Sequence, residues 1–255
     1  MKFNYVHKVV CFTRPDVRNQ DPAGLLSKIE RAAESPLKII KEITGRAEIK
    51  RTLKVNIVPW GDLCLHEYQW DLRRIAFSPF RLSRGERIWK FYDAIVRNGV
   101  FIPEPVFLLE IKRFLFTTKT YLATRWIDGA CSLDHLASAG KIPESGDLQV
   151  ILLKYVDAIA NLHNAGFVHG DLKWSNLLCV SNRDPDIALI DLDALEKTSS
   201  VRMLARDFGR FLIPPKHYQL QRETIDLLIE RYLGRRGESR LLKRVIGAYI
   251  AKKKK

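Results

Sequence analysis

Residues 167–193 hold the feature that most constrains this chain: a polar loop between two apolar, strand-like runs. The loop carries His169, Asp171, Lys173 and Asn176, and the second run ends at Asp191. Short apolar runs bounded by polar turn residues are typical of strands. The segment therefore predicts a strand, a polar loop and a second strand that delivers a carboxylate at its end.

The loop has the spacing of a known catalytic motif. Residues 169–176 read H-G-D-L-K-x-x-N, which matches the protein-kinase pattern H-R-D-L-x-x-x-N except that Gly170 replaces the arginine. Asp191 lies where the metal-binding aspartate of D-F-G would fall, although Leu192 and Asp193 follow it. Four matches at one spacing, with the expected strand and aspartate after them, favour phosphoryl transfer.

Phosphoryl transfer explains why these residue types stand at this spacing. The nucleophile must be oriented and magnesium must bridge the phosphates, while little covalent chemistry is needed. Asp171 could accept the hydroxyl proton, Lys173 could reach the transferring phosphoryl group, and Asn176 and Asp191 offer hard oxygen ligands for Mg²⁺. The alternative is a structural loop in which Asp171 caps a turn, Asn176 bonds backbone, and Asp191 and Asp193 line a solvated strand end.

Composition limits the class of protein. A chain of 255 residues with 46% hydrophobic residues can bury a good core, so disorder is not expected. No apolar run approaches the roughly 18 residues of a spanning helix, and the N-terminus lacks a secretory signal. The cysteines show no C-x-x-C pairing, which indicates free thiols and a cytoplasmic protein.

The net charge of +14 is concentrated at the C-terminus. Residues 231–255 hold ten Lys or Arg against one acid, Glu238, and so contribute +9. This is either a solvated basic helix with a frayed tail or a segment attracted to a polyanion. Tyr249 and Ile250 beside the lysines resemble the end of a surface-seeking helix, which favours a membrane or glycolipid over nucleic acid.

Hydrophobic periodicity and turn residues predict alternating elements along the chain. Residues 22–35 read as a helix with Asp21 as N-cap, and a short strand is possible at 5–12. Strands are predicted at 37–43, 47–57, 63–68, 106–111 and 121–127. Helices are predicted at 83–99, 148–165, 200–213 and 225–233, followed by a basic C-terminal helix.

The expected nucleotide-binding residues of the first half depart from the kinase pattern. The first turn holds a single glycine, Gly45, and His66 stands where the third strand should carry the lysine that contacts the phosphates. Lys54 or Lys50 could supply that charge, as in the with-no-lysine kinases; alternatively His66 donates a neutral hydrogen bond, the nucleotide site is crippled, or His66 has no role. Glu86 is a candidate partner of the active-site cation, although the capping box Ser83-x-x-Glu86 also explains it.

Two polar residues outside the loop also bear on its structure. Asp207 could brace the catalytic loop, or it could be an exposed acid on its helix. His163, near the end of the predicted helix before the loop, reads as structural.

With these pieces placed, the chain resembles the lipopolysaccharide kinase family, the InaA/WaaP-like group of the protein-kinase-like superfamily. The similarity covers about residues 37–215, and its specific parts are the loop at 169–178 and Leu-Ile-Asp-Leu-Asp at 189–193. The resemblance implies transfer of phosphate from ATP, with Mg²⁺, to a heptose or Kdo sugar of the bacterial lipopolysaccharide inner core. It implies Asp171 as the base, Asn176 and Asp191 as metal ligands and Lys173 as a phosphate contact, whereas the family's third-strand lysine has no counterpart at His66.

The expected fold is α+β, a two-lobed protein-kinase-like fold with an antiparallel-sheet N-lobe and a mainly helical C-lobe. Residues 1–36 are expected as an N-terminal extension, 37–127 as the N-lobe and 128–255 as the C-lobe with its basic tail. The expected partners are the lipopolysaccharide core, an anionic glycolipid, and an anionic membrane surface at the inner face of the inner membrane, with no nucleic acid. Competing hypotheses are another kinase-fold phosphotransferase, acting on a protein or a small molecule, and a catalytically silent kinase-like binding module.

Overall fold

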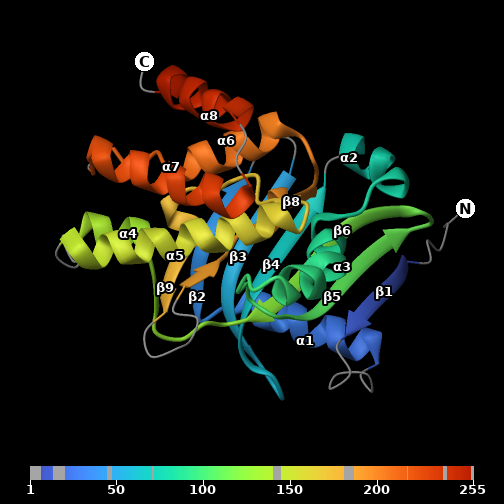
Figure 1. The fold of residues 1–255 in the computed structure, drawn as a ribbon. Helices are drawn as coiled ribbons and strands as arrows, with labels where there is room; N and C mark the ends of the chain where they lie inside the picture. The colour runs from blue at the N-terminus through green and yellow to red at the C-terminus, as the bar shows by residue number, and fades with distance from the viewer. Residues whose placement is uncertain are drawn as a thin grey trace, which may run out of the picture. The chain divides into compact units, whose positions relative to one another are not determined.

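The structure is a computed structural model that describes residues 7–13, 21–44, 48–70, 72–139, 145–180, 187–216, 218–237 and 240–253. The chain forms two compact units (Figure 1). The first comprises Met1–Lys90 with Pro103–Trp126, and the second comprises Phe91–Ile102 with Ile127–Lys255. We call them the N-terminal and the C-terminal unit.

One antiparallel sheet forms the centre of the N-terminal unit. Its strand order is β1-β5-β6-β4-β3-β2. The strands are β1 His7–Thr13, β2 Lys38–Thr44, β3 Glu48–Ile57, β4 Gly61–Trp70, β5 Pro105–Arg113 and β6 Phe116–Arg125. The five strands predicted between residues 37 and 127 are confirmed, as is the antiparallel sheet.

The segment before residue 37 belongs to the core of this unit. Helix α1, Pro22–Glu34, begins as predicted, because the Asp21 carboxylate accepts a hydrogen bond from the Gly24 amide at 2.9 Å. Its buried residues, Leu25, Ile29 and Ala33, recur every four positions and join the apolar cluster on one face of the sheet. Strand β1 pairs with β5, so the expected N-terminal extension contributes both a strand and a helix.

The opposite face of the sheet carries polar side chains. Because side chains alternate along a strand, Lys50, Thr52 and Lys54 of β3 share this face with Cys64, His66 and Tyr68, their register partners on β4. The start of α3, Arg84–Arg97, packs against it, since a Cβ added at Gly85 would lie 2.5 Å from a methyl carbon of Leu108. Two short helical segments, α2 Leu72–Phe77 and η2 Ser78–Phe80, precede α3.

The C-terminal unit is mainly helical, as predicted. Its helices are α4 Leu133–Ser138, α5 Ser145–Asn164, α6 Val201–Phe211, α7 Arg222–Arg236 and α8 Arg240–Lys253. Its strands are β7 Ala130–Ser132, β8 Phe167–Val168, β9 Leu177–Val180, β10 Ile187–Leu189 and β11 Glu196–Lys197, with the 3-10 helices η3 Trp174–Asn176 and η4 Leu192–Ala194. The strands pair as β10-β9-β7 and β11-β8, and in Figure 1 α7 lies beside α5 and α8 beside α6.

Part of the basic C-terminal segment is structural. Arg231 and Arg235 of α7 each donate two hydrogen bonds of 2.8–3.0 Å to the carboxylate of Asp157 on α5. Arg236 donates to Asn164 at 2.7 Å. Partial burial raises the pKa of Asp157, but the two arginines outweigh it and hold the pKa below its usual range. These three cations therefore fasten α7 to α5.

The expectation that Tyr249 and Ile250 form a surface-seeking helix end is wrong. Ile250 is buried, and Tyr249 packs on α6, where a Cβ added at Gly209 would lie 2.5 Å from a Tyr249 ring carbon. Glycine at position 209 thus allows α8 to approach α6 closely. The two residues hold α8 against the helix that carries Asp207 and Arg210.

Candidate active site

The predicted catalytic loop runs from β8 through η3 into β9. Gly170 adopts a left-handed conformation with φ +84°, and a Cβ added there would lie 2.6 Å from the Ala194 carbonyl oxygen. A residue with a side chain would be strained and would clash with backbone. This explains why glycine stands where protein kinases have arginine.

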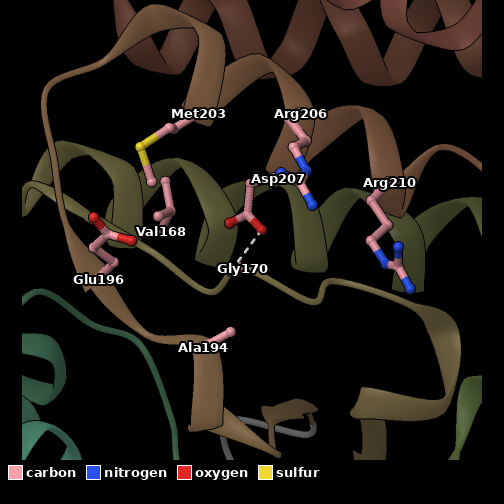
Figure 2. Close-up of a pocket in the computed structure, with 8 residues that line it drawn as sticks. All are labelled: Val168, Gly170, Ala194, Glu196, Met203, Arg206, Asp207 and Arg210. Carbon is pink, nitrogen blue, oxygen red and sulfur yellow. Dashed lines mark hydrogen bonds between the residues drawn. The ribbon is translucent and has the colours of Figure 1, made fainter. Parts of the chain in front are cut away.

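Asp207 of α6 braces the loop. Its carboxylate accepts hydrogen bonds from the backbone amides of His169 and Gly170, both at 2.8 Å (Figure 2 shows the Gly170 bond). Asp207 is only 4% exposed. Of the two interpretations of this residue, the brace is therefore confirmed and the exposed acid is wrong. Trp174, farther along the loop, donates from its indole nitrogen to the Phe211 carbonyl at 2.9 Å, so α6 holds the loop at two points.

Two further buried side chains support Asp207. His163 Nε2 lies 3.1 Å from an Asp207 oxygen, and His163 Nδ1 lies 2.6 Å from the Tyr232 hydroxyl. Burial lowers the pKa of His163 despite the nearby carboxylate, and burial raises the pKa of Tyr232. A neutral His163 thus donates to Asp207 and accepts from Tyr232. The structural role predicted for His163 is confirmed.

We expect Asp207→Ala to lower the free energy of unfolding by about 3 kcal/mol, because it leaves the buried His169 amide, the Gly170 amide and the buried His163 ring without their acceptor. Urea denaturation of the full chain measures this change. Asp226→Asn on α7 is the matched control, since that acid is mostly exposed and its pair with Arg222 spans 3.9 Å; surface changes of this kind stay within about 0.5 kcal/mol. An Asp207→Ala protein as stable as this control would contradict the brace.

His169 orients the loop through three contacts. Besides its amide bond to Asp207, its ring Nδ1 accepts from the Asp171 amide at 3.3 Å. A ring nitrogen that accepts carries no proton, so Nε2 holds the proton and donates to the Ile190 carbonyl at 2.8 Å. The fully buried ring therefore ties the loop to the residue next to Asp191.

Asp171 has both carboxylate oxygens engaged. Oδ2 lies 2.8 Å from Lys173 Nζ, and Oδ1 lies 2.8 Å from Arg210 Nη2. Partial burial raises the pKa of this carboxyl, but the Lys173 hydrogen bond and the charges of Lys173 and Arg210 outweigh it and lower the pKa. Asp171 is thus ionised at neutral pH, as a proton acceptor must be.

Asn176 and Asp191 approach each other through the backbone. Asn176 donates from Nδ2 to the Asp171 carbonyl at 2.9 Å and to Asp171 Oδ2 at 3.3 Å, which turns its amide oxygen the other way. The Ile190 amide donates to the Asn176 carbonyl at 3.0 Å, and Asp191 follows in a left-handed conformation with φ 58°. The two residues predicted as metal ligands therefore stand just before β9 and just after β10, two strands that pair with each other.

This donor set suits magnesium. Mg²⁺ prefers oxygen ligands and is usually held by one or two carboxylates together with substrate phosphates, so a cage made by the protein alone is not needed. No group of three or more His, Cys, Asp or Glu forms such a cage within the described part of the chain. One amide oxygen and one carboxylate, from Asn176 and Asp191, fit an ion that completes its shell with phosphates and water.

The candidates of the N-terminal unit are distributed over the polar face of the sheet. His66 lies 3.5 Å from both Thr52 Oγ1 and Cys64 Sγ, and its ring stacks on Tyr68 with centroids 6.3 Å apart. Lys54 pairs with Asp62 at 2.7 Å. Lys50 is only 4% exposed and lies 5.8 Å from the centre of the Tyr68 ring.

Glu86 and Gly45 have different outcomes. The Glu86 carboxylate accepts from the Ser83 amide at 2.7 Å, and the Ser83 hydroxyl accepts from the Glu86 amide at 3.0 Å, which confirms the capping box. A nucleotide-binding role for Glu86 stays a prediction. Gly45 lies outside the described residues.

Arg210 is the residue of this site that sequence reasoning missed. It stands three residues after Asp207, so both project from one face of α6 toward the loop (Figure 2). The sequence signal that could have identified Arg210 was its position three residues after Asp207 on the same predicted helix, which places both side chains on one helix face.

Comparison with known proteins places the chain in a family. Among solved structures it resembles WaaP in complex with acyl carrier protein, with a TM-score of 0.66 and 16% identity over 96% of this chain and 97% of that one. At this identity the likeness shows the fold, and it confirms the expected α+β protein-kinase-like fold. The comparison with curated proteins found no match. The family model of the lipopolysaccharide kinase (Kdo/WaaP) family matches residues 71–232, which is more than half of the chain. The chain, with its braced H-G-D loop and its aspartate after β10, therefore belongs to the lipopolysaccharide kinase (Kdo/WaaP) family.

Proposed function

We propose that the protein transfers the γ-phosphoryl group of ATP to a hydroxyl of a heptose or Kdo sugar in the bacterial lipopolysaccharide inner core. The observation that carries the proposal is the Asp171 carboxylate, which is ionised, partly exposed, and fixed by a loop that Asp207 and Trp174 anchor to α6. Membership in the lipopolysaccharide kinase family supports the acceptor class.

The loop residues have distinct roles in this reaction. Asp171 accepts the proton of the attacking sugar hydroxyl and orients that oxygen toward the phosphorus. Lys173, 2.8 Å from Asp171, stabilises the negative charge on the transferring group. Asn176 and Asp191 would hold Mg²⁺, which supplies charge neutralisation to the phosphates when bound.

Lys50 is the best candidate for the cation that His66 does not provide. Lys50 lies on the same face of the sheet as His66. It pairs across the strands with Tyr68, two residues after His66 on β4, and it is buried beside the Tyr68 ring. Lys54 shares that face but is engaged by Asp62 near the β3–β4 turn, and its Nζ lies 4.7 Å from the centre of the Trp126 ring. Of the two lysines considered from the sequence, the contacts thus favour Lys50.

We expect Lys50→Met to lower kcat/KM for ATP by about a hundredfold, the effect of removing one preorganised donor to a phosphoryl group. Lys54→Met should have a much smaller effect, since it removes a partly exposed ion pair near the β3–β4 turn. Steady-state kinetics of both variants at saturating acceptor measures the difference. A larger loss in Lys54→Met would reverse the assignment.

A comparison of acceptors tests the proposed function. The full chain is incubated with labelled ATP, Mg²⁺ and, in separate reactions, dephosphorylated lipopolysaccharide core, an aminoglycoside or a general protein acceptor. Label in the core alone is the expected result. Label in another acceptor would indicate a different kinase-fold phosphotransferase, and no label in any, with Asp171→Asn leaving function in the cell intact, would indicate a silent binding module.

The proposed site of action in the cell is based on the acceptor and on the cations of the C-terminal segment that do not fasten α7 to α5. Arg240, Lys243, Arg244, Lys252 and Lys253 are exposed on α8, which supports peripheral contact with anionic lipid at the cytoplasmic face of the inner membrane. Among the described residues, none of the helices has the length and apolar character needed to span a bilayer. Sedimentation with anionic vesicles tests the contact; binding that is absent at low salt would contradict it.

A further inference from the structure

A small cavity lies between the catalytic loop and α6 (Figure 2). It has a volume of about 220 Å³, and its polar lining includes Gly170, Glu196, Arg206, Asp207 and Arg210. Pockets that enclose a whole small molecule usually measure about 300–1,000 Å³. This one has room for a single group of a larger ligand.

Two arginines dominate the charge of the cavity. Arg206 and Arg210 are four residues apart on α6, so they lie on one face of the helix, and both side chains extend toward the loop (Figure 2). Like charges at this spacing repel each other. Arg206 forms no ion pair with the part of the chain that the structure describes. An anion between the two guanidinium groups would relieve the repulsion.

The acidic residues of the lining do not neutralise this pair. The Asp207 carboxylate is engaged by the amides of His169 and Gly170 and by His163. Glu196 is exposed and lies on the opposite side of Figure 2 from Arg210. The Arg206 end is therefore open to an external carboxylate or phosphate.

Arg210 connects the cavity to the base. Its Nη2 lies 2.8 Å from Asp171 Oδ1, while Lys173 covers Oδ2 at 2.8 Å. A base must bring one oxygen within about 2.6–3.2 Å of the hydroxyl that it deprotonates. Each carboxylate oxygen can accept about two hydrogen bonds, and Oδ2 also accepts from Asn176 Nδ2 at 3.3 Å. An acceptor hydroxyl should therefore approach Oδ1, the oxygen that Arg210 contacts.

We propose that Arg206 and Arg210 form a subsite for an anionic group of the acceptor, and that this anion draws Arg210 away from Asp171 and exposes the base. The proposal rests on the proposed function and adds the chemistry of the acceptor: a carboxylate or phosphate close to the reacting hydroxyl. Arg206 then binds the acceptor, and Arg210 both binds it and controls access to Asp171.

Binding measurements test the subsite without requiring turnover. Calorimetric titration of the full chain compares Kdo, which carries a carboxylate, with heptose phosphate and with carboxyl-reduced Kdo. We expect at least one anionic probe to bind about tenfold more tightly than the neutral one, or about 1.4 kcal/mol. Arg206→Ala and Arg210→Ala should each lose this preference. Arg202→Ala, an exposed arginine one turn earlier on α6, should keep it.

The two anionic probes identify the source of the charge. A preference for Kdo alone assigns the subsite to a carboxylate, and a preference for heptose phosphate alone assigns it to a phosphate. Equal binding of all three probes, or an unchanged preference in Arg206→Ala and Arg210→Ala, would overturn the proposal.

Transfer kinetics separate the access role of Arg210 from binding. With an anionic acceptor, Arg206→Ala and Arg210→Ala should both raise KM about tenfold. With a neutral acceptor, Arg210→Ala should raise kcat/KM, because Arg210 no longer occupies Asp171 Oδ1; Arg206→Ala should not. An unchanged kcat/KM for the neutral acceptor in Arg210→Ala would exclude the access role. Absence of transfer to every core acceptor would refute the proposed function, while the titrations would still decide the anion subsite.

Discussion

Asp171→Asn should lower kcat for transfer to the core sugar by about a thousandfold, within the 10²–10⁴ range of general base catalysis. Asparagine keeps the size of the side chain and a hydrogen-bonding oxygen, but it cannot accept the proton of the hydroxyl. The fold should persist, because Asp171, Lys173 and Arg210 are 29%, 38% and 39% exposed and pairs of this kind contribute little to stability. Binding of magnesium-ATP should also remain, since Asp171 is not among the proposed metal ligands.

Single-turnover kinetics with saturating magnesium-ATP measures this loss at the chemical step. Asp157→Asn is a matched control, because Asp157 also bridges two arginines, Arg231 and Arg235, but does so on α5. The control should retain the wild-type rate. If Asp171→Asn stays within about threefold of wild type, or if Asp157→Asn falls as far, Asp171 is not the base.

Asp191→Ala should remove the dependence of nucleotide binding on magnesium. A direct ligand should contribute more than the roughly 10–100-fold carried by the outer partners of metal ligands. Titration of the wild type with a fluorescent ATP analogue should therefore show much tighter binding in Mg²⁺ than in EDTA. The variant should show the same weak affinity in both.

Because Asp191 has a positive φ angle, Asp191→Ala could also disturb the backbone, so a second variant is needed. Its left-handed conformation is disfavoured for alanine and better tolerated by asparagine. Asp191→Asn thus keeps the local backbone and one oxygen donor while it removes the charge, so its magnesium dependence should be reduced rather than lost. If both variants fold, as circular dichroism would show, and bind magnesium-ATP like the wild type, the metal assignment is wrong.

Local sequence patterns were sufficient for most of the fold. The Asp21 N-cap, the Ser83–Glu86 capping box and the periodicity of residues 148–165 each depend on neighbours within a few positions, and the structure confirms them. The family resemblance added the order of the lobes. Strand β1 was harder to predict, because it pairs with β5 about a hundred residues later.

The parts of the site that depend on tertiary packing were not predictable in this way. The role of Asp207 remained open because its partners stand 37 and 38 residues earlier in the chain. Arg210 was missed because only the approach of α6 to the loop brings it to Asp171. The interpretation of Tyr249 and Ile250 failed because their apolar surface is covered by α6, and hydropathy alone does not tell a protein contact from a lipid contact.

Lys50 and Lys54 also show that the sequence pattern alone does not predict tertiary contacts, even for residues on the same strand. The two lysines are four residues apart on β3 and so lie on the same face of the sheet, and strand periodicity predicts the same environment for both. Their surroundings differ because Asp62, next to the β3–β4 turn, pairs with Lys54, whereas Lys50 lies buried beside Tyr68. Neither contact can be derived from the spacing of the residues.

The central claim is that this chain moves the γ-phosphoryl group of ATP onto a core sugar, and the identity of the product tests it most directly. Dephosphorylated core oligosaccharide is incubated with the full chain, Mg²⁺ and ATP labelled with ¹⁸O in the γ-phosphoryl group, and the product is analysed by mass spectrometry and ³¹P NMR. The expected product is a phosphomonoester on a heptose or Kdo residue that carries the label, and this product should be lost in Asp171→Asn. An unchanged core, with the label in inorganic phosphate or on the protein itself, would contradict the account.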